Sequence, residues 1–134
     1  MEFRSAALIL ARAEERAIEE ENDSTTTTLE ISVQHHVPYG QMVCISGSVR
    51  ELGDWDPKSA PALTWSEGDV WVGEVDVKRH QLGKLEYKFV VLIPEDPQRF
   101  EWETGSNHNI LALPCRRISI RDRWGFPGYN HNIP

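Results

Sequence analysis

A chain of 134 residues fits a single domain with a modest hydrophobic core. Forty per cent of its residues are hydrophobic and five are tryptophan, a composition typical of folded proteins. Its formal net charge of −7 disfavours nucleic acid and anionic membrane surfaces as partners, because both bind clustered Lys and Arg. A neutral polymer remains a compatible ligand.

The N-terminal part of the chain is expected to form a helical extension. Residues 3–21 contain no Gly or Pro and are rich in Ala, Leu, Arg and Glu. Their narrow apolar stripe favours a frayed extension over a partner-binding helix. The apolar run of residues 6–11 is too short for a secretory signal or a membrane span, so we expect an intracellular protein in the cytoplasm, with a plastid as the alternative.

From Leu29 onward the hydrophobic period changes from helical to two, which is the pattern of half-buried strands. Leu29, Ile31 and Val33 alternate with polar residues, and Trp71 alternates in the same way and is assigned to the core. Short strands separated by turns at this spacing predict a β-sandwich or barrel. The expected strands cover residues 29–34, 42–45, 70–77, 85–93, 100–103, 110–113 and 115–123.

These patterns divide the chain into three parts. Residues 1–28 are expected to be the helical extension and a polar linker, in which the linker covers residues 24–28. Residues 29–124 form the predicted β domain. Residues 125–134 contain Gly, Pro and Asn without a period, which indicates a C-terminal tail or linker.

No catalytic signature is present in the sequence: it has no GxSxG, no Gly-rich phosphate loop, no HExxH and no CxxC. We therefore expect no enzyme activity, no cofactor and no metal ion. Glu101 and Glu103 share a strand face and could serve glycoside hydrolysis in a cleft, but a solvated acidic pair is favoured. His80, His108 and His131 are expected to be solvated surface histidines.

The cysteines allow two interpretations. Cys44 and Cys115 could form one disulfide bond, although two widely spaced cysteines are not a disulfide framework. Two free, partly buried thiols are the favoured interpretation.

The aromatic residues are the unusual part of this sequence. Trp55 lies in a Gly-Asp-Trp-Asp-Pro loop, where it either plugs the end of the sandwich or forms an exposed platform. An indole ring stacks on the C–H face of a pyranose, while the sugar hydroxyls require polar partners beside it. Such partners lie near Trp102 in Glu103 and Asn107, with Lys88 facing outward on the preceding strand. By strand parity Trp102 could also belong to the core.

A series of short motifs follows in a specific order between Leu29 and Trp124. The motifs are Tyr39-Gly40-Gln41, Ile45-Ser46-Gly47-Ser48, Glu51-Leu52-Gly53-Asp54-Trp55, Val70-Trp71, Leu85-Glu86-Tyr87-Lys88-Phe89, Phe100-Glu101-Trp102-Glu103, Asn107 and Arg121-Asp122-Arg123-Trp124. In this order and spacing the sequence resembles the family 20 carbohydrate-binding modules, the starch-binding domains.

The resemblance implies an all-β fold, an immunoglobulin-like antiparallel β-sandwich of about seven or eight strands. It implies non-catalytic binding of starch-type α-1,4-glucans such as starch, glycogen and maltodextrins. In the first glucan site of such modules, Trp55 and Trp102 would stack on sugar rings. Lys88, Glu103 and Asn107 would contact their hydroxyl groups.

The resemblance also implies a second glucan site, in which Tyr39 matches one aromatic residue. The family usually has a further tyrosine in a longer loop, which is absent here, and Trp65 could substitute for it. Two other interpretations stay open. The chain could be the targeting module of a larger starch- or glycogen-active enzyme, with a catalytic domain or partner protein beside it. It could also be an immunoglobulin-like protein-interaction domain.

Overall fold

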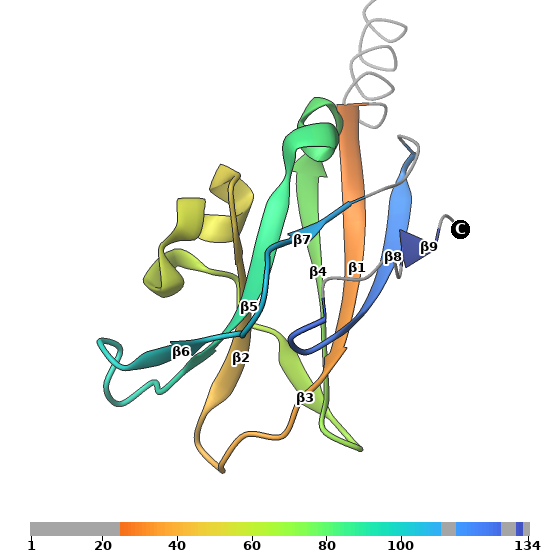
Figure 1. The fold of residues 1–134 in the computed structure, drawn as a ribbon. Helices are drawn as coiled ribbons and strands as arrows, with labels where there is room; N and C mark the ends of the chain where they lie inside the picture. Colours follow the sequence, from red (N-terminus) through yellow and green to blue (C-terminus); the bar gives the residue numbers. More distant parts are fainter. Residues whose placement is uncertain (1–24, 111–114, 127–130, 133–134) are drawn as a thin grey trace, which may run out of the picture.

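A computed structural model describes residues 25–110, 115–126 and 131–132 as two facing β-sheets (Figure 1). One sheet has the strand order β3-β4-β1-β8-β9; the other has the order β2-β5-β6, with β7 also paired to β5. The strands are β1 (Thr26–Gln34), β2 (Met42–Gly47), β3 (Thr64–Ser66), β4 (Val70–Lys78), β5 (Glu86–Leu92), β6 (Phe100–Trp102), β7 (His108–Asn109), β8 (Arg117–Arg123) and β9 (His131–Asn132).

The core lies between the two sheets, where strand alternation places apolar side chains. Every second residue of β1 from Thr27 to Val33 is buried, as the period of two predicts. From the opposite sheet Tyr87 and Phe89 of β5 project into the same core and are fully buried. Trp71 is also buried, and its indole nitrogen donates to the carbonyl oxygen of His35 at 3.0 Å. The predictions of a two-sheet β fold and of a core Trp71 are therefore confirmed.

The sheet is not antiparallel throughout, and in this respect the prediction was wrong. Strand β8 runs parallel to β1, with Ile118 beside Leu29 and Ile120 beside Ile31. The chain crosses over from the other sheet before it enters β8, so β8 reaches β1 from the end at which β1 itself begins. Hydrophobic alternation reports which face of a strand is buried, but it carries no information on strand direction.

The boundaries of the domain also differ from the predicted ones. Strand β1 begins at Thr26, inside the segment predicted as a linker, because Thr26–Thr28 pair with Val77 and its neighbours on β4. In the segment predicted as a tail, β9 pairs with β8. Strand β3 was missed, and the described residues form nine strands where about seven or eight were predicted. The predicted helix at residues 3–21 and most of the predicted strand at 110–113 lie outside the described residues.

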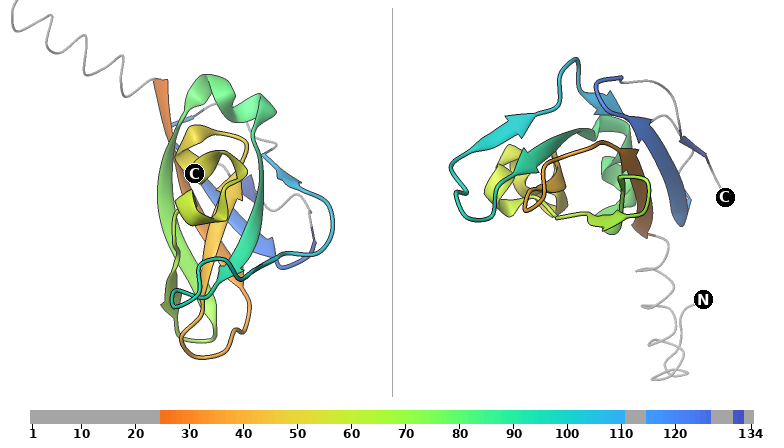
Figure 2. Two further views of the ribbon diagram at one scale, coloured as in Figure 1. Left: turned by 90° about the vertical axis from the view of Figure 1, so that its left-hand side faces the viewer. Right: turned by 90° about the horizontal axis from the view of Figure 1, so that it is seen from below.

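Three short 3₁₀ helices complete the described fold: η1 (Arg50–Trp55), η2 (Pro57–Ser59) and η3 (Arg79–Lys84). Figure 2 shows η1 and η2, in yellow, at one side of the sandwich, next to the end of β2. Within the described residues no helix is long and apolar enough to cross a membrane.

Candidate functional site

The loop that carries Trp55 has an unusual backbone. Gly53, Asp54 and Trp55 have φ angles of +79°, +50° and +67° in succession, and such angles are disfavoured for residues with a side chain. Gly53 is required here, because a Cβ atom on it would lie 2.8 Å from the carbonyl carbon of Ser59. The loop is held in place by the fully buried Leu52. Strain of this kind persists only where the surrounding structure enforces it, and it concentrates at functional sites.

This loop places Trp55 beside Trp102 of β6. The two ring centroids are 6.2 Å apart and the ring planes are inclined at 60°. Both side chains are partly exposed. The structure thus brings together the two tryptophans that the resemblance assigned to one site, and it places Trp102 outside the core.

Lys88 lies on the outer face of β5, between the buried Tyr87 and Phe89, as predicted from strand parity. Its ammonium group donates to the carbonyl oxygen of Glu103 at 3.0 Å and to that of Gly105. Lys88 therefore ties β5 to the loop that follows β6.

Asn107 lies at the end of the same loop. Its amide nitrogen donates to Oε1 of Glu86 at 2.8 Å, so its orientation is fixed by β5. Asn107 is half-buried and polar, as a fringe residue of a surface site would be.

The prediction of a solvated acidic pair was wrong for Glu103, because its side chain is fully buried, while Glu101 is exposed. The carboxylate accepts from the backbone N–H of Phe89 at 3.0 Å, from that of Gly125 at 2.6 Å, and contacts Nε2 of His108 at 2.7 Å. Its oxygens are therefore engaged inside the domain. The two acids do not face one another across a cleft.

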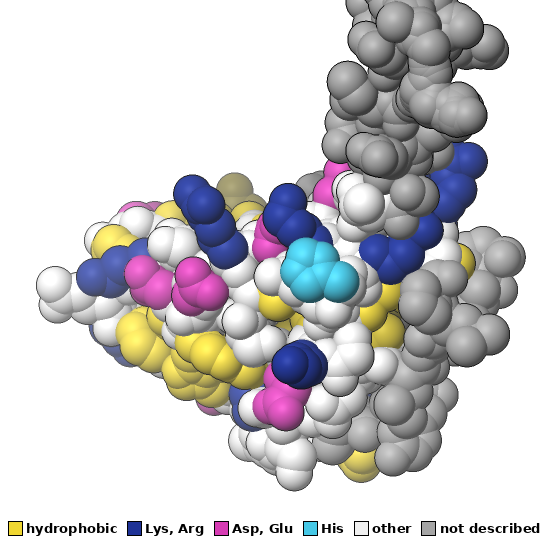
Figure 3. Space-filling model, turned by 90° about the horizontal axis from the view of Figure 1, so that it is seen from above, with side chains coloured by type: hydrophobic (Ala, Val, Ile, Leu, Met, Phe, Trp, Pro, Cys, Tyr) yellow, Lys and Arg dark blue, Asp and Glu magenta, His cyan; other side chains and the backbone are white. Residues whose placement is uncertain are grey.

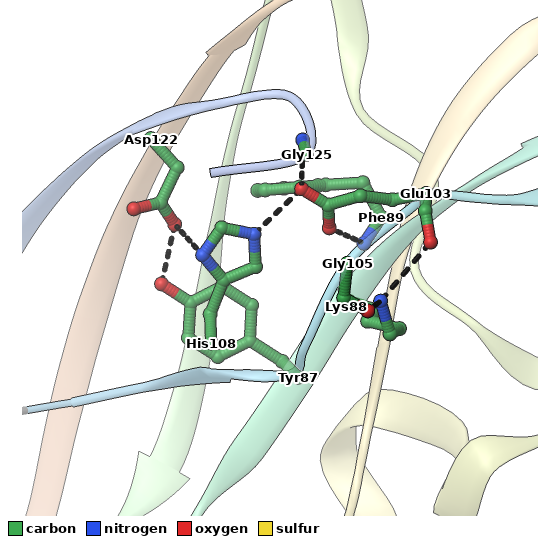
Figure 4. Close-up of polar contacts among 8 residues, drawn as sticks. All are labelled: Tyr87, Lys88, Phe89, Glu103, Gly105, His108, Asp122 and Gly125. Carbon is green, nitrogen blue, oxygen red and sulfur yellow. Dashed lines mark hydrogen bonds and ion pairs between the residues drawn. The ribbon is translucent and has the colours of Figure 1, made fainter. Parts of the chain in front are cut away.

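His108 is also buried, so the prediction of a solvated surface histidine was wrong for this residue. Its ring stacks on Tyr87 with 5.0 Å between the centroids, and Nδ1 lies 3.6 Å from Oδ2 of Asp122. The hydroxyl of Tyr87 donates to the same Asp122 carboxylate (Figure 4). Burial first, and the Asp122 carboxylate second, raise the pKa of Tyr87, so its hydroxyl stays protonated. We call Tyr87, Glu103, His108 and Asp122 the buried polar cluster.

One signal for this cluster was present in the sequence. Asp122 shares strand parity with Ile118 and Ile120, which places a carboxylate on the core face of β8. Because buried carboxylates require hydrogen-bonding or charged partners, an inward Asp predicts polar groups opposite it. Nothing in the local sequence around His108 marks it as one of those partners.

The residues predicted for a second site lie in a turn and on a short strand at another end of the sandwich. Tyr39, in the turn between β1 and β2, is fully exposed, and Trp65 on β3 is 53% exposed. The indole nitrogen of Trp65 donates to Oδ1 of Asp69 at 2.9 Å, and Nδ1 of His36 lies 3.1 Å from Oδ2. These two contacts hold the pKa of Asp69 below its ordinary value. The turn between β1 and β2 and the loop between β3 and β4 both lie at the lower end of the view in Figure 1.

The remaining candidates add no further site. Cys44 is buried and Cys115 is partly exposed, and neither forms a disulfide bond, which confirms the prediction of free thiols. Burial raises the pKa of Cys44 to about 11. Among the described side chains, no group of three His, Cys, Asp or Glu residues is arranged to hold a metal ion.

Comparison with known proteins adds an independent line of evidence. Residues 24–116 match the family described as "Starch binding domain". Glucoamylase-1 of Schizophyllum commune is 26% identical over 99 residues, which are 74% of this chain and 16% of that protein. The structure of a glycoside hydrolase family 15 glucoamylase from Hypocrea jecorina matches with a TM-score of 0.64 and 25% identity, over 75% of this chain and 17% of that one.

A third match is to an isolated domain. The family 20 carbohydrate-binding module of a maltotetraose-forming amylase from Pseudomonas saccharophila STB07 superposes with a TM-score of 0.58 at 24% identity, over 72% of this chain and all of that one. This match shows that the fold is that of a carbohydrate-binding β-sandwich. Because the family match covers more than half of the sequence, the chain belongs to the starch-binding domains of carbohydrate-binding module family 20. The chain spans about a sixth of the length of the two glucoamylases.

Proposed function

We propose that this chain binds α-1,4-glucans without cleaving them, through stacking of sugar rings on Trp55 and Trp102. One observation carries the proposal. A bulky tryptophan is held in a left-handed backbone conformation, and this conformation places its ring next to a second, partly exposed indole. Core packing does not require the strained backbone of Trp55, whereas a binding platform requires the ring to be held in this position.

The geometry of the pair favours an α-linked glucan over a flat polymer. The apolar C–H face of each sugar stacks on an indole ring. Two rings inclined at 60° match successive sugars of a curved chain, and α-1,4 linkage makes a glucan curve. A flat β-1,4-glucan would require two nearly coplanar rings.

The polar fringe of this site consists of Lys88 and Asn107. Two protein contacts of the Lys88 ammonium group use two of its three N–H donors, which leaves one for a sugar hydroxyl. Asn107 offers an amide oxygen beside it. Glu103, which the resemblance assigned to sugar contacts, is proposed instead to position this fringe, because Lys88 binds its carbonyl oxygen and its carboxylate is buried.

The expected affinity is modest. If each indole loses about 100 Å² of apolar area to the glucan, the gain is about 5 kcal/mol at about 25 cal/mol per Å². Polar contacts add to this gain, while association and ordering remove several kcal/mol. A dissociation constant between about 10 μM and 1 mM follows.

Tyr39 and Trp65 are proposed as a weaker second glucan site. Both rings are exposed, and Asp69 and His36 provide hydrogen-bonding groups beside Trp65. A second site on the same molecule would raise the avidity for an insoluble, multivalent granule even if its own affinity is low.

A role as targeting module of a larger starch-active enzyme is the second candidate. The observation in its favour is that the matched glucoamylases are far longer than the segment they share with this chain. In such an enzyme the module would keep a catalytic domain near its polymer substrate.

Starch co-sedimentation tests the proposal. The parent chain is expected to pellet with granular starch and to respond to maltoheptaose in tryptophan fluorescence, whereas Trp55→Ala and Trp102→Ala should each lose at least about tenfold in affinity. The circular dichroism spectrum and melting temperature of each variant control for folding. If both folded variants bind as the parent does, the assigned site is wrong. If the parent itself shows no binding up to about 10 mM maltoheptaose, glucan binding is refuted and the result favours a protein-interaction domain.

A further inference from the structure

A third aromatic side chain lies next to the tryptophan pair. The ring of Phe100 is 6.2 Å from that of Trp102 in an edge-to-face arrangement, the same separation as between Trp55 and Trp102. Phe100 and Trp102 are two residues apart on β6, so their side chains lie on the same face of the strand. Because Phe100 is 43% exposed, much of its ring is available to a ligand.

Strand register extends this surface across the sheet. Phe100 pairs with Leu92 on β5, and Leu92 pairs with Met42 on β2, so the three side chains form one cross-strand row. We call this row the apolar ridge. It runs beside the row that contains Trp102 and Val90, and Leu92 and Met42 are half-buried. Figure 3, which views the molecule from above, shows hydrophobic side chains gathered along the side on which β6 lies.

Polar groups lie directly next to the exposed ring. A groove of about 400 Å³ is lined by Phe100 and by Gln41, Val91, Ile93, Gln98, Arg99 and Glu101. Each glutamine amide supplies both donors and acceptors without a charge. An aromatic ring beside amide, guanidinium and carboxylate groups that can bond to hydroxyls is a combination that recognises a sugar.

The apolar ridge also lies next to Trp102, where a ligand longer than the tryptophan pair would extend beyond it. Strand β6 is at the edge of its sheet in the order β2-β5-β6, so among the described strands none pairs with its outer side. We propose that a longer α-glucan continues from Trp102 onto Phe100 and the adjoining groove, so that Phe100 forms an additional sugar subsite. This inference rests on the proposed function and specifies its substrate class: chains long enough to reach beyond the two tryptophans.

Calorimetric titration with maltotriose and maltoheptaose tests the additional subsite. The parent chain should bind maltoheptaose more tightly than maltotriose. Phe100→Ala should weaken maltoheptaose binding about fivefold to tenfold, which corresponds to about 1 to 1.4 kcal/mol, and should leave maltotriose binding unchanged. Phe100→Tyr, which keeps the ring, should retain the parent's preference for the longer chain.

Val72→Ala is the matched control, since Val72 is an exposed apolar residue on β4 of the other sheet. It should bind both oligosaccharides as the parent does. If Phe100→Ala and the parent bind maltoheptaose equally, the additional subsite is refuted while the tryptophan site stands. If the parent binds neither sugar, the proposed function itself fails. If Phe100→Ala weakens both sugars equally, Phe100 acts only by supporting Trp102, and the subsite is again refuted.

Discussion

Two sets of side chains alternate along β5, β6 and the loop after β6, and they differ in burial and in chemistry. The outer set, Trp102, Lys88 and Asn107, is partly exposed and consists of a ring with polar neighbours. The inner set is the buried polar cluster, in which carboxylates, an imidazole and a phenol satisfy one another. Residues adjacent in sequence, such as Tyr87 and Lys88, thus belong to different sets.

This difference in burial shows how contacts inside a small domain can hold the residues of a surface site in place. The outer residues come from β5, from the edge strand β6 and from the loop that follows β6. The inner set links the same segments from below, because Glu103 bonds to the backbone of β5 and to Gly125 after β8. We therefore expect changes in the outer set to alter binding and changes in the inner set to alter stability first.

The largest expected effect is on stability and comes from Glu103→Ala. This change leaves two backbone N–H donors and the ring of His108 without their carboxylate partner in the interior. A loss of about 3 kcal/mol or more in the free energy of unfolding is expected. Urea denaturation followed by tryptophan fluorescence measures it. Glu101→Ala, at an exposed position on β6, is the control and should change stability by less than about 0.5 kcal/mol. Equal stability of the two variants would contradict the division into inner and outer sets.

Two neighbouring residues on β5 provide a sharper comparison. Tyr87→Phe removes only the hydroxyl that donates to Asp122, and it should cost about 1 to 3 kcal/mol of stability with little change in glucan affinity. Lys88→Met removes the ammonium group at the surface, and it should weaken glucan binding severalfold with a smaller change in stability. Thermal unfolding and maltoheptaose titration of both variants measure the two effects. The comparison fails if Tyr87→Phe proves the weaker binder.

The outer set was largely predictable from the sequence, and the reason is the period of two. Tyr87, Lys88 and Phe89 alternate in the middle of a regular strand, so the outward position of Lys88 follows from its neighbours. The platform role of Trp55 was suggested by its Gly-Asp-Trp-Asp-Pro loop and by the family resemblance. The left-handed conformation of Trp55 itself was not predictable, since it is imposed by contacts of the folded loop.

The buried polar cluster could not be predicted in the same way. Strand β6 ends at Trp102, and beyond its end parity no longer decides the direction of Glu103. The partners of Glu103 are distant in sequence, since Gly125 is 22 residues away, and no local pattern connects them. The parallel pairing of β8 with β1, which brings Asp122 towards His108, is likewise a property of the topology.

The smallest expected effect concerns the pH dependence of stability at His35. Its ring stacks on Trp124 at 3.6 Å, and burial lowers its pKa below the ordinary value of 6.5, although Glu101 and Glu103 oppose this shift. The unfolded chain therefore binds a proton more readily than the folded one, and stability is expected to fall as the pH drops below about 6.5.

His35→Phe keeps the stacked ring without a titrating group. Calorimetry at about pH 7.5 and about pH 5.5 measures the melting temperature of both chains. Between these two pH values, the melting temperature of His35→Phe should fall less than that of the parent chain. His80→Phe, at an exposed position on η3, is the control and should behave as the parent does. An unchanged pH dependence in His35→Phe would mean that burial beside Trp124 does not influence this titration.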